Sequence, residues 1–241
     1  MLWINALILF LSSFLTGLVV FIKPVVKPIY FTLSLAFSGA YLFTLTLTHI
    51  LPELFAEAAT PFHIGIFVVI GFLMQVLLEF FTEGIEHGHL HHHNLNANTM
   101  LAALCVHALL EGTLLSHPSH HHEHGETNTL LFGIVIHKIP EAFAFAAVLL
   151  TQIKQKYKMI ALLLIFALAS PIGVLSSNFI NVESVVSKQI TETLFAIVAG
   201  NFLHISTTIF FESNPQHQFN GKRLLCIIGG VLVAVLAEGI L

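Results

Sequence analysis

Eight apolar segments, each about as long as a bilayer is thick, dominate the 241-residue sequence. A helix needs about 20 consecutive apolar residues to cross a membrane. Cutting the chain at its polar and proline-containing stretches gives such segments near residues 2–22, 30–52, 62–82, 97–116, 128–151, 158–178, 189–211 and 223–240. Only 9% of the residues are charged, against about 25% in soluble domains. We therefore predict an all-α polytopic membrane protein with eight transmembrane helices, whose residues 1–241 form a single transmembrane domain.

The remaining composition excludes other classes of protein. The nine Lys and Arg residues are spread along the chain and the net charge is −4, so no basic face predicts a nucleic-acid partner. Cys105 and Cys226 lie inside apolar segments, where packing residues are expected rather than a disulfide. The first segment has no basic residue before it and is interpreted as a span rather than a cleaved signal peptide.

The basic residues also predict an orientation, because Lys and Arg are retained in short cytoplasmic loops. Seven of the nine fall on one side of the predicted spans: Lys23, Lys27, Lys154, Lys156, Lys158, Lys222 and Arg223. Lys188 lies on the opposite side, and Lys138 lies inside the fifth span. This distribution predicts a multi-pass protein of the cytoplasmic or plasma membrane with both termini external.

One histidine-rich stretch separates the third and fourth spans, and another separates the fourth and fifth. By the orientation above, the loop at 86–95 is cytoplasmic and the loop at 117–127 is external. Dense neutral imidazoles can capture divalent metal ions, although a merely soluble linker is the alternative. The histidines concerned are His87, His89, His91, His92 and His93 in the first loop, and His117, His120, His121, His122 and His124 in the second.

The most informative residues are ionisable groups at bilayer depth, where each one is costly. His107 and Glu111 in the fourth span are four residues apart and share one helix face. His137 and Glu141 repeat that spacing in the fifth span. Together they supply two nitrogens and two oxygens, a tetrahedral set suited to zinc. The alternative is a hydrogen-bonded contact between the helices.

Two further residues of the fifth span lie beside these ligands. Pro140 cannot donate a hydrogen bond to the carbonyl of Ile136, so we expect a kink and a freed backbone oxygen next to His137. Lys138 places an ammonium group within a turn of Glu141. It is interpreted as a fixed charge that takes the electrostatic place of a second cation, and the alternative is that it snorkels away.

Other polar residues near the span ends suggest a route for a cation. His49 and Glu53 repeat the spacing at the outer end of the second span, and His204 lies between the membrane levels. A series of weak ligands suits stepwise conduction, although each residue alone is equally well an interfacial anchor. The inner-end members are Glu79, Glu83 and Glu212.

These motifs resemble those of the ZIP (Zrt- and Irt-like) family of divalent-metal transporters. The similar stretches follow the family's order along nearly the whole chain: THILPEL, HALLEG, HKIPEA, SPIG and AGNFLH. The resemblance implies eight helices in a 3+2+3 inverted-repeat bundle, external termini, metal uptake toward the cytoplasm and a homodimer. It also implies an elevator-like motion in which spans one, four, five and six move.

Many relatives have a two-metal site, and here the sequence departs from their pattern. The resemblance places the first metal at His107, Glu111, His137 and Glu141. The positions that complete the second metal site are Ala108, Lys138 and Ser170 in this chain, and none of them readily serves as a carboxylate or amide ligand. We therefore predict one transported metal, with Lys138 in place of the second.

The leading hypothesis is a zinc importer, for which Zn²⁺ is the substrate and no organic cofactor is expected. Cadmium, iron, manganese, cobalt and nickel are plausible competitors for the same donor set. A membrane metalloenzyme is disfavoured, because the chain has no HExxH motif and lacks the extra carboxylates of a di-iron centre. A metal-sensing receptor without net flux and an exporter remain the alternatives.

Overall fold

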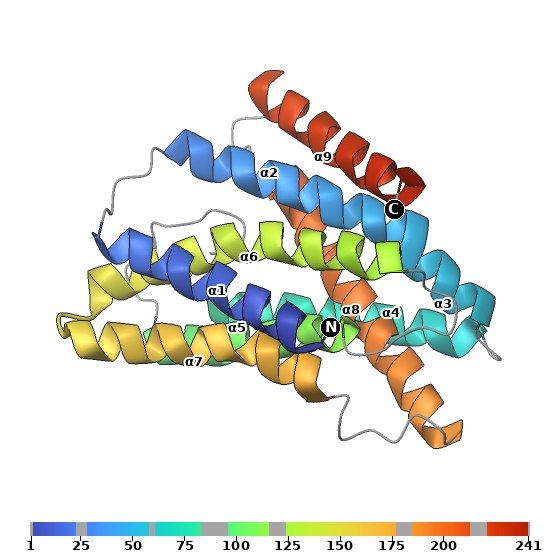
Figure 1. Cartoon of the computed structure of the whole chain (residues 1–241), viewed down its shortest axis with the longest axis horizontal. Helices are drawn as coiled ribbons and strands as arrows, with labels where there is room; N and C mark the ends of the chain where they lie inside the picture. The colour runs from blue at the N-terminus through green and yellow to red at the C-terminus, as the bar shows by residue number, and fades with distance from the viewer. Residues whose placement is uncertain are drawn as a thin grey trace.

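The structure is a computed structural model that describes residues 2–22, 28–57, 61–82, 96–115, 124–176, 185–212 and 221–240. Throughout these ranges the regular elements are helical. Figure 1 shows them in chain order: α1 (Leu2–Ile22), α2 (Pro28–Leu45), the π-helical turn η1 (Thr46–Ile50), α3 (Leu51–Glu57), α4 (Pro61–Thr82), α5 (Ala97–Leu114), α6 (His124–Gln152), α7 (Lys156–Leu175), α8 (Val185–Glu212) and α9 (Gly221–Ile240).

Seven helices among the described residues are long and apolar enough to cross a membrane. They are α1, the continuous helix 29–56, and α4 to α8, so the multi-pass membrane architecture is confirmed. Helix α9 has 20 residues and is not one of these seven. In Figure 1 both ends of the chain lie on the right-hand side of the bundle.

The second span is longer than the predicted segment 30–52, because α2, η1 and α3 form one uninterrupted helix. In η1 the Leu51 N–H bonds to the carbonyl of Thr46, five residues earlier. Pro52 follows directly and has no N–H to offer the carbonyl four residues before it. The wider turn therefore absorbs a proline that would otherwise interrupt the helix.

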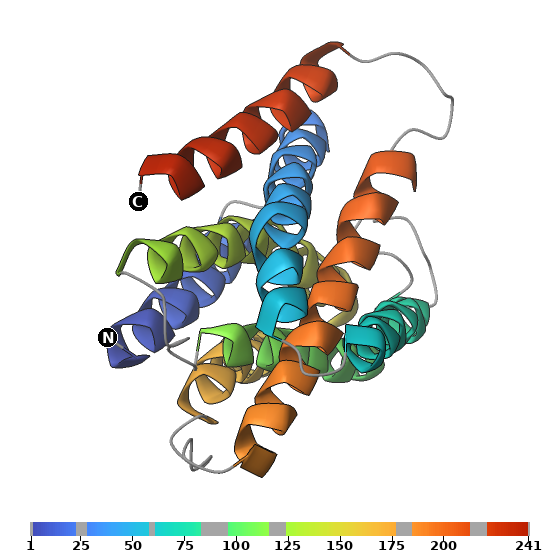
Figure 2. The same cartoon turned by 90° about the vertical axis from the view of Figure 1, so that its right-hand side faces the viewer.

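The helices pack as two groups that meet along one interface (Figures 1 and 2). In the first group α1 packs against α6 and α7, and α5 packs against α7. In the second group α2 packs against α8 and α9, and α4 packs against α8. The contacts of α2 with α6 and of α5 with α4 and α8 join the two groups.

Glycines allow the closest of these helix pairs to approach one another. A Cβ atom on Gly71 of α4 would lie 2.0 Å from the carbonyl oxygen of Ile197, and one on Gly200 of α8 would lie 2.0 Å from that of Val68. Because lipid provides no hydrophobic driving force between helices, such small-residue contacts are the usual means of tight packing in membranes.

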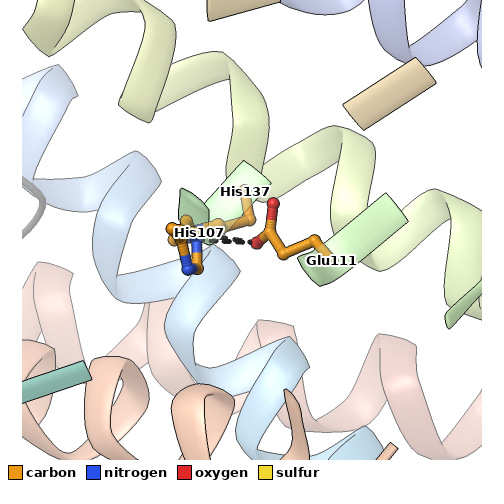
Figure 3. A group of neighbouring side chains, drawn as sticks. All are labelled: His107, Glu111 and His137. Carbon is orange, nitrogen blue, oxygen red and sulfur yellow. Dashed lines mark ion pairs between the residues drawn. The ribbon is translucent and has the colours of Figure 1, made fainter. Parts of the chain in front are cut away.

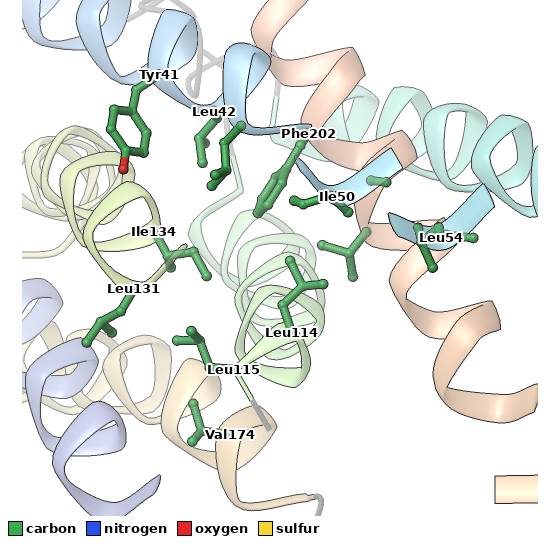
Figure 4. Close-up of a cluster of buried hydrophobic side chains, with 14 of the residues drawn as sticks. Tyr41, Leu42, Ile50, Leu54, Leu114, Leu115, Leu131, Ile134, Val174 and Phe202 are labelled. Atoms are coloured by element: carbon green, nitrogen blue, oxygen red, sulfur yellow. The ribbon is translucent and has the colours of Figure 1, made fainter. Parts of the chain in front are cut away.

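Two clusters of buried apolar side chains fill the bundle. The first surrounds α5 up to Ala108 and α6 from Ala142 onward, together with α7 and parts of α2 and α8. The second, shown in Figure 4, includes Leu114 of α5 and Ile134 of α6 and extends to α2, α3 and α8. The ionisable residues of α5 and α6 lie where the two clusters meet, so apolar side chains enclose them on both sides.

Candidate metal centre

The centre is built on α5 and α6, whose ends are tied together away from the site. Asn96 caps α5 through a 3.0 Å bond from the Asn98 N–H. The Ala97 N–H donates to Oε1 of Gln152 at the end of α6, also at 3.0 Å. Backbone donors at the start of α5 are thereby satisfied, and one of those bonds joins the two helices that carry the candidate ligands.

The ionisable side chains of the centre are almost completely removed from solvent. The exposed fraction is 0% for His107, Glu111, His137 and Lys138, and 2% for Glu141. Burying charged groups costs several kcal/mol each unless they are paired, so the contacts among these side chains decide whether the arrangement is tolerable.

Glu111 directs its carboxylate toward both histidines, as Figure 3 shows. Its Oε1 lies 3.0 Å from Nε2 of His107 and 3.8 Å from Nε2 of His137. The two imidazole rings stand nearly perpendicular, with their centroids 5.9 Å apart. One donor atom from each of the three residues falls within 4.8 Å of the others, and all three residues are buried.

This spacing suits a small divalent cation. Zinc binds nitrogen and oxygen ligands at about 2.0–2.2 Å, so neighbouring donors in a tetrahedral site are about 3.3 Å apart. The two distances from Glu111 to the histidines lie on either side of that value.

Lys138 joins the carboxylates of both helices. Its Nζ lies 2.5 Å from Oε2 of Glu111 and 2.6 Å from Oε2 of Glu141. The ring of Phe166 on α7 lies 5.5 Å from the same nitrogen, within cation–π range. Lys138 is therefore held inside the bundle and does not snorkel toward the membrane surface.

The structure brings three of the four predicted ligands together, and the fourth is linked to them through another side chain. His107, Glu111 and His137 form the compact group. Glu141 is linked to that group through the Lys138 ammonium that it shares with Glu111.

Pro140 lies inside α6, whose helical structure continues through it. Of the positions that replace second-metal ligands, Ala108 belongs to the first apolar cluster and Ser170 is buried on α7.

The predicted route residues lie in two separate pairs. His49 in η1 and Glu53 in α3 have Nε2 and Oε2 3.9 Å apart and are partly exposed. Oε2 of Glu79 on α4 is in close contact with Nε2 of His204 on α8, and the Phe72 ring packs edge-on against His204. Glu83, the side chain of Glu212 and the two histidine-rich loops, including the side chain of His124, lie outside the described residues.

Sequence reasoning missed two buried amides at the interface of α4 and α8. Gln75 and Asn201 are both 0% exposed. With its amide oriented to donate, the Asn201 nitrogen lies 2.6 Å from the carbonyl of Gly71 and 3.2 Å from that of Ile197. A single glutamine in the otherwise apolar stretch of α4 was the signal that could have revealed this interface. Cys105 and Cys226 are free thiols in the structure.

Comparison with known protein families shows to which family the chain belongs. The family model described as ZIP Zinc transporter matches residues 83–238, which is more than half of the sequence and includes every residue of the metal centre. The chain belongs to the ZIP zinc transporter family. A search of curated proteins returns no match. Membership of the ZIP family makes the chain a transporter of divalent metal ions and confirms the resemblance inferred from the motifs.

Proposed function

We propose that the chain imports zinc into the cytoplasm through a single metal site in the middle of the membrane. The buried group of His107, Glu111 and His137 carries this proposal, because its two imidazole nitrogens and one carboxylate oxygen already lie together. Glu141 provides the fourth ligand when its carboxylate turns from Lys138 toward the metal. The absence of thiolate and thioether ligands from this set favours zinc over softer ions.

The charges of the site support one metal rather than two. The two glutamates and Lys138 sum to −1, and a bound divalent cation changes this to +1. A second cation would raise the charge to +3 in an apolar enclosure, where unbalanced charge is costly. Anomalous scattering from zinc-loaded protein tests the proposal, since two peaks within about 4 Å of each other would contradict it.

The packing of the helices supports the proposed 3+2+3 inverted repeat. In such a repeat the first span corresponds to the sixth, the second to the seventh, the third to the eighth and the fourth to the fifth. Accordingly, the pair α1–α6 corresponds to α7–α5, and the pair α2–α9 corresponds to α8–α4. In each of these four pairs, the two helices pack against each other.

The same packing supports an elevator-like motion. The helices proposed to move, α1, α5, α6 and α7, pack against one another and carry the metal centre. The remaining long helices form the second group. Sliding of the first group against the second would expose the site alternately to each side of the membrane, with His49 and Glu53 on the outer route and Glu79 and His204 on the inner one.

Zinc uptake into liposomes tests the proposed function. Purified protein would be reconstituted beside the His107→Ala/Glu111→Ala double variant, and entry of radioactive zinc would be followed. We expect uptake by the native protein and only background uptake by the double variant, because two of the three grouped ligands are lost.

His63→Ala is the matched control, since His63 is an exposed histidine on α4. It should retain native uptake. Stoichiometric zinc binding without flux by correctly inserted native protein would favour a receptor over a carrier. Equal uptake by the native protein and the double variant would instead show that zinc crosses by another route.

A further inference from the structure

The connection between α6 and α7 presents a concentrated basic surface that the metal centre does not use. Three lysines occur within five residues there, Lys154, Lys156 and Lys158, and all three are exposed. No Asp or Glu occurs in the sequence between Glu141 and Glu183. The three lysines therefore have no carboxylate close to them along the chain.

The short length of this connection determines its depth in the membrane. Helices α6 and α7 both qualify as membrane spans, and only residues 153–155 separate them. The lysines consequently lie within one helical turn of the span ends, at the level of the phospholipid headgroups. Tyr157 lies among them with 73% of its surface exposed, and tyrosine is enriched at this interface.

Hydrogen bonds also order the backbone of this connection. The Ile153 N–H bonds to the Leu149 carbonyl at 2.9 Å, and the Gln155 carbonyl accepts the N–H groups of Lys158 at 3.0 Å and Met159 at 3.1 Å. The Tyr157 hydroxyl lies 3.2 Å from Oε1 of Gln155. The basic side chains thus extend from an ordered backbone.

We propose that Lys154, Lys156 and Lys158, with Tyr157, bind the headgroups of anionic phospholipids. Ammonium groups at headgroup depth pair with the lipid phosphates, and the excess negative charge of an anionic leaflet strengthens the attraction. This inference goes beyond the transported metal and does not depend on the direction of transport.

Such binding would act on the helices that carry the metal centre. The connection joins α6, which contains His137, directly to α7. The bond from the Ala97 N–H to Gln152 ties the start of α5 to the same end of the bundle. Bound lipid therefore anchors one end of the site-bearing group, and we expect zinc uptake to be faster in membranes that contain anionic lipid.

Tryptophan quenching by brominated lipids measures the binding without any transport. The chain has a single tryptophan, Trp3, in the first turn of α1. That end of α1 lies on the right of Figure 1, whereas α6 ends and α7 begins on the left. In a Trp3→Phe/Tyr157→Trp variant, the only tryptophan reports on the basic surface.

We expect brominated phosphatidylglycerol to quench this tryptophan more than brominated phosphatidylcholine does. Adding Lys154→Gln, Lys156→Gln and Lys158→Gln should remove the preference, with about a fivefold loss of relative lipid affinity for each lysine. Lysine-to-arginine changes at the same positions should retain it. Quenching by phosphatidylcholine confirms that each variant is inserted.

The matched control retains Trp3 and Tyr157, so that its tryptophan reports on the opposite end of the bundle. There the three lysine changes should leave the quenching by both lipids unaltered. Equal quenching of the tryptophan at position 157 by both lipids, or a preference that survives the triple change, would overturn the proposal. Because quenching requires no flux, its outcome is independent of whether zinc is transported.

Discussion

Nζ of Lys138 lies between the carboxylates of Glu111 and Glu141, 2.5 Å from one and 2.6 Å from the other. One buried ammonium group thus holds together the acidic residues of two helices. The substitution Lys138→Met replaces this ammonium group with a neutral side chain and leaves two unbalanced carboxylates in an apolar enclosure. Breaking a buried pair in this way costs about 3–5 kcal/mol, so metal-free protein should unfold at a clearly lower temperature.

Zinc should reverse much of that loss in Lys138→Met. The charge of the site before metal binding changes from −1 to −2, so the cation binds more tightly and leaves more slowly. Thermal unfolding and zinc titration, each with native protein beside the variant, measure the two effects. Unchanged stability together with unchanged zinc affinity would show that Lys138 does not balance the carboxylates.

The two glutamates should differ in their importance for transport. Glu111 contacts both histidines, whereas Glu141 reaches the group through Lys138. We expect Glu111→Gln to reduce zinc uptake to background. Glu141→Gln should retain measurable uptake, because the three grouped ligands His107, Glu111 and His137 remain. Uptake rates over a range of zinc concentrations measure the difference, and the reverse order would assign the central role to Glu141.

Close packing of α5 against α7 should be needed to position Glu111. A Cβ atom on the adjacent Gly112 would lie 2.2 Å from the Ser170 carbonyl oxygen, and one on Gly173 would lie 2.1 Å from that of Leu109. Gly112→Ala therefore forces the helices apart, and we expect a loss of about 1–3 kcal/mol in stability together with weaker zinc binding. Thermal unfolding and zinc titration measure both quantities.

Gly65→Ala on α4 is the control for the packing prediction. A Cβ atom there meets no neighbouring heavy atom within 4 Å, and alanine favours a helix more than glycine does. Its stability should equal or exceed that of the native protein. If Gly112→Ala stabilised the protein as Gly65→Ala does, helix propensity, and not the approach of α5 to α7, would explain the result.

Arg223 should stabilise the end of α8. This arginine of α9 is 7% exposed, and its guanidinium donates to the carbonyls of Ile209 and Phe210. Carbonyls in the last turn of a helix have no partner within the helix, and a cation there also complements the helix dipole. Arg223→Met should cost about 1.5–3 kcal/mol and speed hydrogen exchange at the end of α8. The substitution Leu225→Ala, at a residue of α9 that is 70% exposed, should do neither.

Cross-linking tests the motion between the helix groups. In a chain without Cys105 and Cys226, Leu42→Cys and Gly133→Cys place thiols on α2 and α6, where a Cβ atom on Gly133 would lie 3.3 Å from the Leu42 side chain. A short bifunctional thiol reagent should stop zinc uptake by this variant. Uptake at the native rate in the cross-linked protein would exclude sliding at this contact.

The matched cross-link joins two helices of the second group. Gly39→Cys and Ile209→Cys connect α2 to α8, where the Cβ positions are 3.3 Å apart. Because these helices stay together in the proposed motion, uptake should survive the cross-link. A reagent whose linker is cleaved by a reductant provides the control. Cleavage should restore uptake in the Leu42→Cys/Gly133→Cys protein and leave uptake by the Gly39→Cys/Ile209→Cys protein unchanged.

The positions of the long helices and of the ionisable residues on them follow from the sequence. Hydropathy is a local property, so the apolar segments near 62–82 and 97–116 correspond to α4 and α5 within a few residues. The four-residue spacing of His107 and Glu111 likewise places them on one helix face whatever the helix packs against. The extension of the second span is an exception, because a π turn absorbs Pro52.

Only the tertiary structure decides which of these side chains meet. Spacing along α5 and α6 does not distinguish Glu111, which contacts both histidines, from Glu141, which reaches them through Lys138. The pairing of Glu79 with His204 links residues 125 positions apart. Such contacts depend on how closely α5 approaches α7 and α4 approaches α8, which the glycines and the surrounding apolar side chains determine together. Hydropathy and helical periodicity describe one helix at a time and carry no information about that approach.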